Sequence, residues 1–281
     1  MHIGVSVWLG LTLLIAPITS TLAEAASTAT TTQFIDVDGH KIAFHVTPGH
    51  EPTIVLDAGG GADSSYWDTL VPELSKRTGS RIITYDRSGL GASEDVSGPW
   101  DVHAATRDLA VGLKKLKATK RVILVSHSLA GEIATYLTGR HPKWFLGAVM
   151  VDANVPDFFT DGAIERAEAM YAPIIAATKA APPTKPGRQL LALSESFVEV
   201  SQEFHRASWP ASVPVIVIVA ERPPLEDPSD AQWWKDAHAQ FAKRAPNRRL
   251  VDAVGSSHDV AHDRPDVILS AIAEIAAGSL R

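Results

Sequence analysis

The chain has 281 residues, which is enough for one large domain with a sizeable hydrophobic core. Hydrophobic residues make up 45% and charged residues 21% of the sequence, as is usual for a globular protein. The net charge of −6 argues against nucleic acid as a partner, because nucleic-acid-binding domains are typically basic. The absence of cysteine excludes a disulfide framework and a thiol nucleophile.

The N-terminus has the pattern of a secretory signal. An apolar segment at 3–18 precedes small residues at 23–25, which a signal peptidase accepts around its cleavage site. A bilayer span takes about 20 apolar residues, so the segment is short for an anchor, although an uncleaved anchor or a buried helix is the alternative. We expect residues 1–25 to be a signal peptide and residues 26–32 a disordered linker. The product would be a secreted or periplasmic protein without stable membrane insertion.

The rest of the chain alternates between strand and helix patterns. The segment FIDVDGHKIAFHV (34–46) contains two alternating runs around Asp38-Gly39, which predicts a β-hairpin. The later apolar runs are rich in valine and isoleucine without polar alternation, which is typical of parallel strands buried on both faces by helices. These predicted strands are 53–58, 81–86, 121–126, 146–153, 213–220 and 249–254. The predicted helices lie near 67–76, 102–117, 129–140, 231–243 and 265–277.

A helical insertion at 155–212 interrupts this alternation and contains the proline-rich bend AAPPTKPG. We predict a small lid of two or three helices between the two parts of an α/β core, 33–154 and 213–281. Ligands of open α/β sheets bind at the carboxyl ends of the strands, so such a lid would cover the site. Most of its aromatic residues are expected to pack the lid onto the core, and a few to line an apolar pocket. Trp233 and Trp234, on a different helix, are interpreted as core residues.

The segment VILVSHSLAG (122–131) raises the question of a serine nucleophile. A buried strand is followed almost at once by a helix, and a side chain on so sharp a turn has a strained backbone and an exposed tip. The strand and the helix approach closely there, so small residues are needed two positions before and after the apex. Ser126 and Ala130 meet this need around Ser128, whereas an apex at Ser126 would place Leu124 in the crowded position. We therefore predict Ser128 as the nucleophile, the alternative being that it caps the following helix.

This segment and three others together resemble the α/β-hydrolase superfamily over about residues 33–278. VSHSLAGE resembles the nucleophile turn, YDRSGLGAS (85–93) the signature after the fourth strand, VLDAGGGADSSYW (55–67) the oxyanion segment and GSSHDVAHDRPDVI (255–268) the C-terminal histidine segment. The chain departs from the family where Ser126 and Ala130 replace glycines and Ala58 replaces a frequent histidine. The resemblance implies the α/β-hydrolase fold, with a mostly parallel eight-stranded sheet, flanking helices and a small helical lid.

His258 and His262 compete as the general base. His258 follows a strand end and a tight turn, which would direct it over the sheet toward Ser128, and its spacing from Pro265 matches that of the family. His262, one helical turn later, is interpreted as a surface or capping residue. No further cluster of metal-ligating residues accompanies His258, His262 and the nearby aspartates, so no metal is expected.

The acid that orients the base is harder to assign. Most family members carry it after the strand that corresponds to 213–220, but this chain continues there with ERPPLEDP. Asp152 ends an earlier strand instead, where haloalkane dehalogenases and certain lactone hydrolases have their acid. A buried lone carboxylate is costly without a partner, and His258 would be such a partner. We predict Asp152. The alternatives are Asp227, Glu226 and Glu221.

The amide of Leu129 is a candidate donor to a developing oxyanion, and the resemblance selects Gly60 as the second donor. The glycine-rich segments lack the spacing of phosphate-binding loops, so no cofactor is expected. The sequence therefore predicts a secreted serine hydrolase that cleaves small carboxylic esters or lactones through a Ser-His-Asp triad and an acyl-enzyme. The alternatives are a peptidase or perhydrolase of the same superfamily and a non-catalytic binding protein on the same fold. The oligomeric state is left open.

Overall fold

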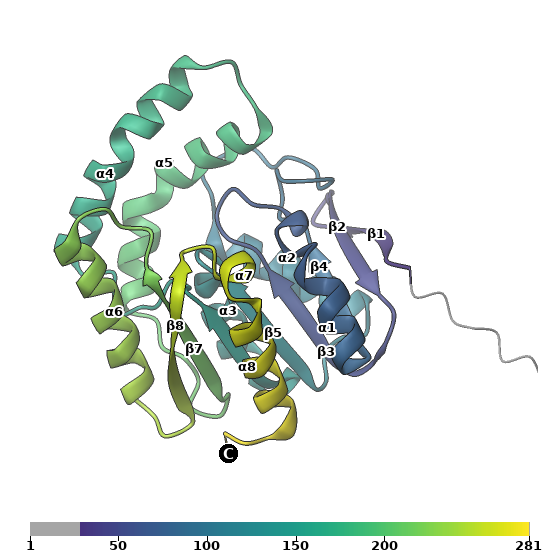
Figure 1. Ribbon diagram of the computed structural model, residues 1–281. Helices are drawn as coiled ribbons and strands as arrows, with labels where there is room; N and C mark the ends of the chain where they lie inside the picture. Colours follow the sequence, from purple (N-terminus) through teal and green to yellow (C-terminus); the bar gives the residue numbers. More distant parts are fainter. Residues whose placement is uncertain (1–28, 281) are drawn as a thin grey trace, which may run out of the picture.

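The computed structural model describes residues 29–280, and an eight-stranded sheet forms the centre of the molecule (Figure 1). In chain order the strands are β1 (Thr31–Val37), β2 (His40–Thr47), β3 (His50–Asp57), β4 (Ser80–Tyr85), β5 (Val122–His127), β6 (Phe145–Val151), β7 (Val215–Arg222) and β8 (Arg248–Ser257). The helices are α1 (Leu70–Thr78), α2 (Val102–Lys115), α3 (Ala130–Arg140), α4 (Asp161–Ala180), α5 (Lys185–His205), α6 (Pro228–Lys243), α7 (Val260–Asp263) and α8 (Pro265–Ala277).

The sheet is mostly parallel, as the sequence predicts. Its strand order is β1-β2-β4-β3-β5-β6-β7-β8, and only the pairs β1–β2 and β2–β4 are antiparallel. The strands β3 to β8 are all parallel, so their carboxyl ends meet at one edge, where ligands of such sheets bind. The prediction of an eight-stranded α/β fold is confirmed.

Two helical layers cover the sheet. Helices α1 and α8 lie in front of it in Figure 1 and pack against side chains such as Ile54 and Leu56. Helices α2, α3 and α6 contribute to the core on the opposite face, which includes Val55. Neighbouring residues of one strand thus enter different layers, and this is why the strand sequences are apolar without alternation.

The N-terminal boundary of the fold differs from the expectation. The expected signal peptide, 1–25, and the beginning of the expected linker lie outside the described residues. The prediction of a disordered linker is wrong for Thr31 and Thr32, because β1 begins at Thr31 and pairs with β2. The turn of this hairpin is Asp38-Gly39, and both residues have a positive φ, as a tight hairpin turn requires.

Helix α1 begins later than predicted. A short 3₁₀ turn at Ser64–Trp67 precedes it, and the α-helix begins at Leu70. With this start Pro72 lies in the first turn, where its missing N–H is not needed for a helical hydrogen bond. A helix from residue 67 would have placed the proline in its interior and lost a backbone hydrogen bond.

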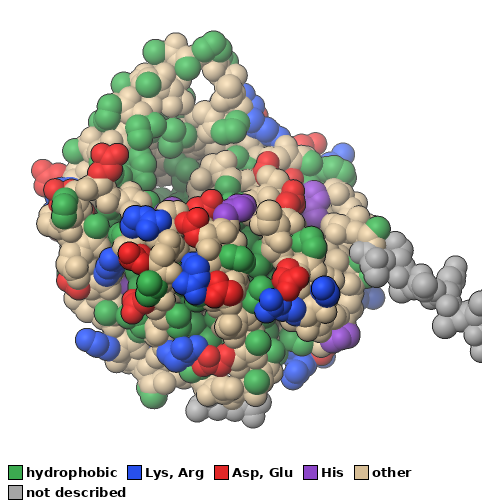
Figure 2. All heavy atoms as spheres, in the orientation of Figure 1, with side chains coloured by type: hydrophobic (Ala, Val, Ile, Leu, Met, Phe, Trp, Pro, Cys, Tyr) green, Lys and Arg blue, Asp and Glu red, His purple; other side chains and the backbone are tan. Residues whose placement is uncertain are grey.

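The insertion forms two helices, α4 and α5, which project as an arm beyond the carboxyl edge of the sheet (Figure 1). Its base is tied to the core by the buried residues Phe158, Phe159, Phe204 and Trp209, whereas Tyr171 is exposed. Figure 2 shows a hollow between the arm and the core, with hydrophobic side chains along the arm. Among residues 29–280, no helix has both the length and the apolar character needed to cross a membrane.

Candidate active site

Ser128 occupies the sharp turn between β5 and α3. Its φ is +55°, a left-handed conformation that is strained for a residue with a side chain. Ser126 and Ala130 are almost fully buried, in agreement with the need for small residues around the turn. The next residue is equally confined, because a Cβ atom on Gly131 would lie 2.2 Å from the carbonyl oxygen of Asn154. The turn is therefore held between the helix and the segment after β6.

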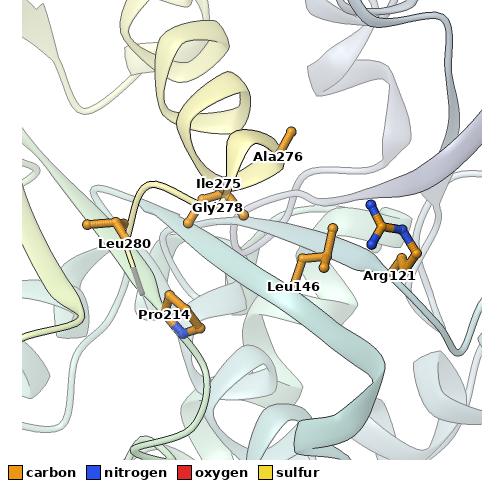
Figure 3. Close-up of a pocket in the computed structure, with 7 residues that line it drawn as sticks. All are labelled: Arg121, Leu146, Pro214, Ile275, Ala276, Gly278 and Leu280. Carbon is orange, nitrogen blue, oxygen red and sulfur yellow. The ribbon is translucent and has the colours of Figure 1, made fainter.

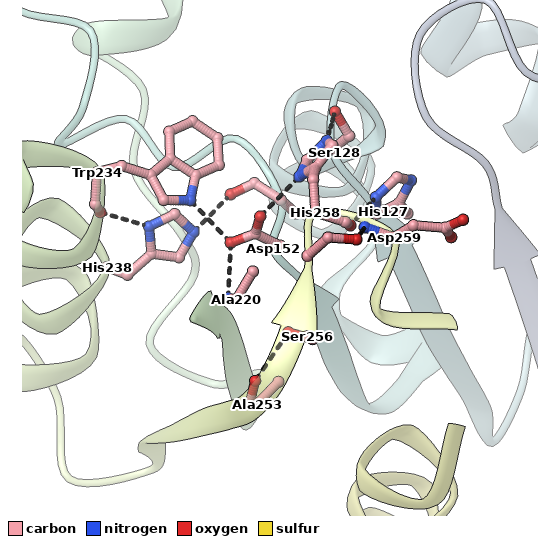
Figure 4. A network of polar contacts seen from close by, with 12 residues as sticks. His127, Ser128, Asp152, Ala220, Trp234, His238, Ala253, Ser256, His258 and Asp259 are labelled. Atoms are coloured by element: carbon pink, nitrogen blue, oxygen red, sulfur yellow. Dashed lines mark hydrogen bonds and ion pairs between the residues drawn. The ribbon is translucent and has the colours of Figure 1, made fainter. Parts of the chain in front are cut away.

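The hydroxyl group of Ser128 contacts a histidine and not the helix N-terminus. Its Oγ lies 3.0 Å from Nε2 of His258, and no side-chain hydrogen bond caps α3 (Figure 4). On the other side of the ring, Nδ1 of His258 lies 2.6 Å from Oδ2 of Asp152. Three elements thus supply one continuous chain of hydrogen bonds: the turn after β5, the end of β6 and the turn after β8.

Asp152 is fully buried, yet its carboxylate has several partners. Its Oδ1 accepts hydrogen bonds from the amide of Ala220 at 3.0 Å and from the indole of Trp234 at 2.8 Å (Figure 4). Burial alone would raise the pKa of Asp152, but the hydrogen bond to His258 and the other polar neighbours outweigh it and hold the pKa below its usual value. The ionised Asp152 accepts a hydrogen bond from the Nδ1–H group of His258, which leaves Nε2 free to accept a hydrogen bond from the Ser128 hydroxyl.

The other candidates for the base and the acid make no hydrogen bond to Ser128 or His258 and have other surroundings. His262 is exposed and pairs with Asp259. Asp227 caps α6 by accepting the amides of Ser229 and Asp230. Glu221 accepts the amide of Gly255, and Glu226 is exposed. Of the histidines and acids weighed from the sequence, the structure brings His258 and Asp152 to Ser128.

The loop after β3 lies against the turn that carries Ser128. A Cβ atom on Gly59 would lie 2.8 Å from Nδ1 of His127 and 3.1 Å from Cβ of Ser128, so only glycine fits there. Gly60 faces Leu129, whose Cβ would lie 3.6 Å from a Cβ at Gly60. No turn, loop or side-chain hydrogen bond within residues 29–280 uses the amide N–H of Gly60 or Leu129. Both amides are therefore candidate donors to an oxygen bound beside Ser128.

The sequence reasoning missed the contribution of His127. This histidine is buried, and its Nε2 donates to the carbonyl oxygen of His258 at 3.0 Å. Its ring stacks on Tyr66 with a centroid distance of 4.6 Å. Burial, assisted by the nearby His258 ring, lowers the pKa of His127 to about 4, so the ring is neutral at neutral pH. His127 thus holds the backbone of His258 in place. In the sequence, only its position next to Ser128 indicates that it belongs to the site.

Trp234 was expected to be a core residue, and it is buried. It also belongs to the site, because its indole N–H donates to Asp152. A tryptophan on an amphipathic helix gives no sequence signal for such a bond. Its partner lies 82 positions away in the chain and is reached only when α6 packs beside the end of β6.

Glu132, in the first turn of α3, is a buried carboxyl group with a single hydrogen-bond partner. Asn154 donates to its Oε1 at 2.7 Å, and Oε2 has no partner among the described residues. Burial raises the pKa of Glu132 from about 4.5 to about 7, and the bond from Asn154 only partly opposes this shift. The folded state thus favours the protonated acid.

We therefore expect Glu132→Gln to stabilise the protein at pH 8 by on the order of 3 kcal/mol. The folded-state pKa is the higher one, so the unfolded state loses its proton first and stability falls as pH rises from about 4.5 to about 7. Glutamine removes this cost and keeps the acceptor for Asn154. Urea denaturation at pH 8 and pH 5 measures the effect, which should be much smaller at pH 5. The exposed Glu226→Gln is the control, and equal effects of both substitutions would contradict the argument.

A cavity of about 60 Å³ lies at the amino ends of the parallel strands, opposite the edge of the sheet that carries Ser128. It is lined by Arg121, Leu146, Pro214, Ile275, Ala276, Gly278 and Leu280 (Figure 3). Arg121 is the one charged side chain of this lining, and it projects at the rim beside the amino ends of the strands. The cavity has no set of converging polar groups comparable to that around Ser128.

Comparisons with known proteins agree with this architecture. The model of the alpha/beta hydrolase family matches residues 54–271. The chain is similar to YqjL of Bacillus subtilis (strain 168), with 24% identity over 79% of this chain and 83% of that protein. Its fold is similar to an esterase from Exiguobacterium antarcticum (TM-score 0.66, 18% identity, 88% and 100% of the two chains). It is also similar to an enol-lactonase from Burkholderia xenovorans LB400 (TM-score 0.59, 18% identity, 87% and 100%). The family match covers most of the chain and all the elements that carry the site, so the protein belongs to the alpha/beta hydrolase family.

Proposed function

We propose that this protein is a serine hydrolase that cleaves carboxylic esters or lactones. The observation that carries the proposal is the continuous hydrogen-bond chain from Ser128 through His258 to Asp152, with Ser128 on a strained turn. Such a constellation activates a hydroxyl group that is a weak nucleophile by itself. The similarity to an esterase and to an enol-lactonase supports a small-molecule substrate.

In the proposed reaction, Nε2 of His258 takes the proton of Ser128 while Oγ attacks the substrate carbonyl carbon. The charge that develops on the carbonyl oxygen is held by the amides of Gly60 and Leu129, and one such donor is typically worth about 3 kcal/mol. The C–O bond to the alcohol then breaks, and His258 returns the proton to the leaving oxygen. Water attacks the acyl-enzyme in the same way and releases the carboxylic acid. Asp152 keeps the ring oriented and stabilises its cation throughout.

We also propose that the enzyme acts outside the cytoplasm. The apolar segment at 3–18 and the small residues at 23–25 support export. The catalytic chemistry requires no cofactor, so an exported protein would need nothing further for activity.

The proposal is tested with p-nitrophenyl esters, lactones, p-nitroanilides and peracid formation, each assayed beside a fluorophosphonate probe. We expect many turnovers per protein molecule on esters or lactones and a covalent adduct that mass spectrometry maps to Ser128. Turnover of anilides or peracid formation alone would assign a peptidase or a perhydrolase instead. Stoichiometric binding without turnover and without an adduct would contradict a hydrolase and favour a binding protein.

A further inference from the structure

Arg87, in the loop after β4, is a buried charged residue that the proposed mechanism does not use. Its side chain is only 6% exposed. Its Nη1 donates to the carbonyl oxygen of Ala58 at 2.5 Å, and its Nη2 donates to the carbonyl oxygens of Gly59 and, at 3.4 Å, Ala62. The guanidinium group therefore binds three carbonyl groups of the same loop, which is the loop that contains Gly60.

The geometry of the peptide bond connects these contacts to the site. In a trans peptide the C=O of one residue and the N–H of the next point in opposite directions. The peptide between Gly59 and Gly60 is trans, since the one cis bond among residues 29–280 is Glu51-Pro52. When Arg87 binds the carbonyl of Gly59, the N–H of Gly60 must point away from the guanidinium group.

The opposite side of the loop is occupied by the turn that carries Ser128. A Cβ atom at Gly59 would lie 3.1 Å from Cβ of Ser128, and Gly60 lies against Leu129. The loop is thus held between Arg87 on its carbonyl side and the Ser128 turn on the other. The carbonyl oxygen of Gly59 also accepts the amide of Ala62 at 3.3 Å, but a run of three glycines has great backbone freedom, so this one long turn hydrogen bond holds the peptide weakly. A fork of charged donors fixes it more strongly than neutral hydrogen bonds would.

The guanidinium group is itself anchored. Its Nη1 lies 2.7 Å from Oδ1 of Asp57, the last residue of β3, whose side chain is 1% exposed. Burial raises the pKa of Asp57 to about 6 although Arg87 opposes the shift. The anchor is rigid because Asp57 pairs with Ser126 in the parallel ladder of β3 and β5. The sheet, the guanidinium group and the loop thus form one connected unit.

We propose that Arg87 is a positioning residue that orients the Gly59–Gly60 peptide so that the Gly60 amide faces the oxyanion formed at Ser128. The inference rests on the proposed function, because it assigns the Gly60 amide to the acyl-transfer step. It predicts that the loss of Arg87 affects the transition state and not the binding of the substrate.

Three variants separate this effect from the loss of the buried ion pair. Asp57→Asn weakens the anchor of Arg87 but leaves the guanidinium group on its three carbonyl groups, and we expect a partial loss of kcat, about threefold. Arg87→Met combined with Asp57→Asn removes both charges and leaves no unpaired buried carboxylate, and we expect kcat to fall about 100-fold with KM within about twofold. Arg87→Lys keeps the charge but lacks the fork, and we expect a loss of about tenfold.

A boronic acid that forms a tetrahedral adduct with the serine provides a second measurement. Among the variants, the one with the lowest kcat should have the highest inhibition constant for the boronic acid, because the adduct uses the same amides as the transition state. The thermal midpoint of each variant is recorded as well, and Arg87→Lys decides the question if the double variant does not fold. Equal losses of kcat in Asp57→Asn and the double variant would overturn the inference, as would a change confined to KM or an unchanged boronate affinity. A Ser128→Ala variant with wild-type turnover would instead overturn the proposed function, so the two failures are distinguishable.

Discussion

Replacement of Ser128 by alanine is expected to lower kcat for p-nitrophenyl ester hydrolysis by about 10⁶-fold and to abolish labelling by a fluorophosphonate. The reason is that Oγ of Ser128 is the atom placed 3.0 Å from the His258 ring on a turn with positive φ. Alanine keeps the Cβ atom and the backbone strain but offers no hydroxyl group. Steady-state kinetics and gel fluorescence of the labelled protein measure the two effects.

Ser126→Ala is the matched control for this substitution. Ser126 lies two residues earlier at the end of β5, and its Oγ is buried without a hydrogen-bond partner among the described residues. Its removal costs no hydrogen bond, so we expect turnover and labelling close to those of the wild type. Persistent labelling of Ser128→Ala, or its loss in Ser126→Ala, would move the nucleophile to another serine.

Asp152→Asn is expected to lower kcat by about 10⁴-fold at neutral pH. Oδ1 of Asp152 accepts two donors, the amide of Ala220 and the indole of Trp234, so the carbonyl oxygen of an asparagine would take that position. Its NH₂ group would then face Nδ1 of His258. Because an NH₂ group can only donate, the imidazole would carry its proton on Nε2, where it could no longer accept the proton of Ser128. The pH–rate profile and kcat of the purified variant measure this loss.

Asp227→Asn provides the comparison for the acid. Asp227 caps α6 through the amides of Ser229 and Asp230, and asparagine caps helices about as well as aspartate. We expect kcat within about twofold of the wild type and an unchanged thermal midpoint. If Asp227→Asn lost more activity than Asp152→Asn, the acid would belong to the loop after β7.

Much of the fold follows from short-range patterns in the sequence. The Asp38-Gly39 turn, the continuous valine and isoleucine runs and the small residues around Ser128 each reflect a local steric demand that the structure meets. The predicted helix near 67–76 begins too early, because Pro72 is accommodated in the first turn of a helix that begins at Leu70 but not in the interior of a longer one. Thr31 and Thr32 have no apolar pattern that predicts a strand, but their pairing with β2 places them in β1.

The assignment of the site residues depends more strongly on contacts between segments that are distant in the chain. His258 and Asp152 are 106 positions apart, and four acidic residues remained candidates as long as only the sequence was considered. Local periodicity reports which side of a strand or helix is buried, but it does not report which strand end meets which loop. The donors from Ala220 and Trp234 and the carbonyl contacts of Arg87 were likewise invisible before the chain was folded.

The sequence by itself determined the α/β architecture and the sharp turn at Ser128, because both depend on steric and hydrophobic patterns within a few residues. Only the tertiary structure decided that Asp152 is the carboxylate that contacts His258 and that Arg87 binds the loop of Gly60. The physical reason is that hydrogen-bond partners of buried polar groups are chosen by the positions of strand ends in space, and these are fixed by the packing of the whole sheet.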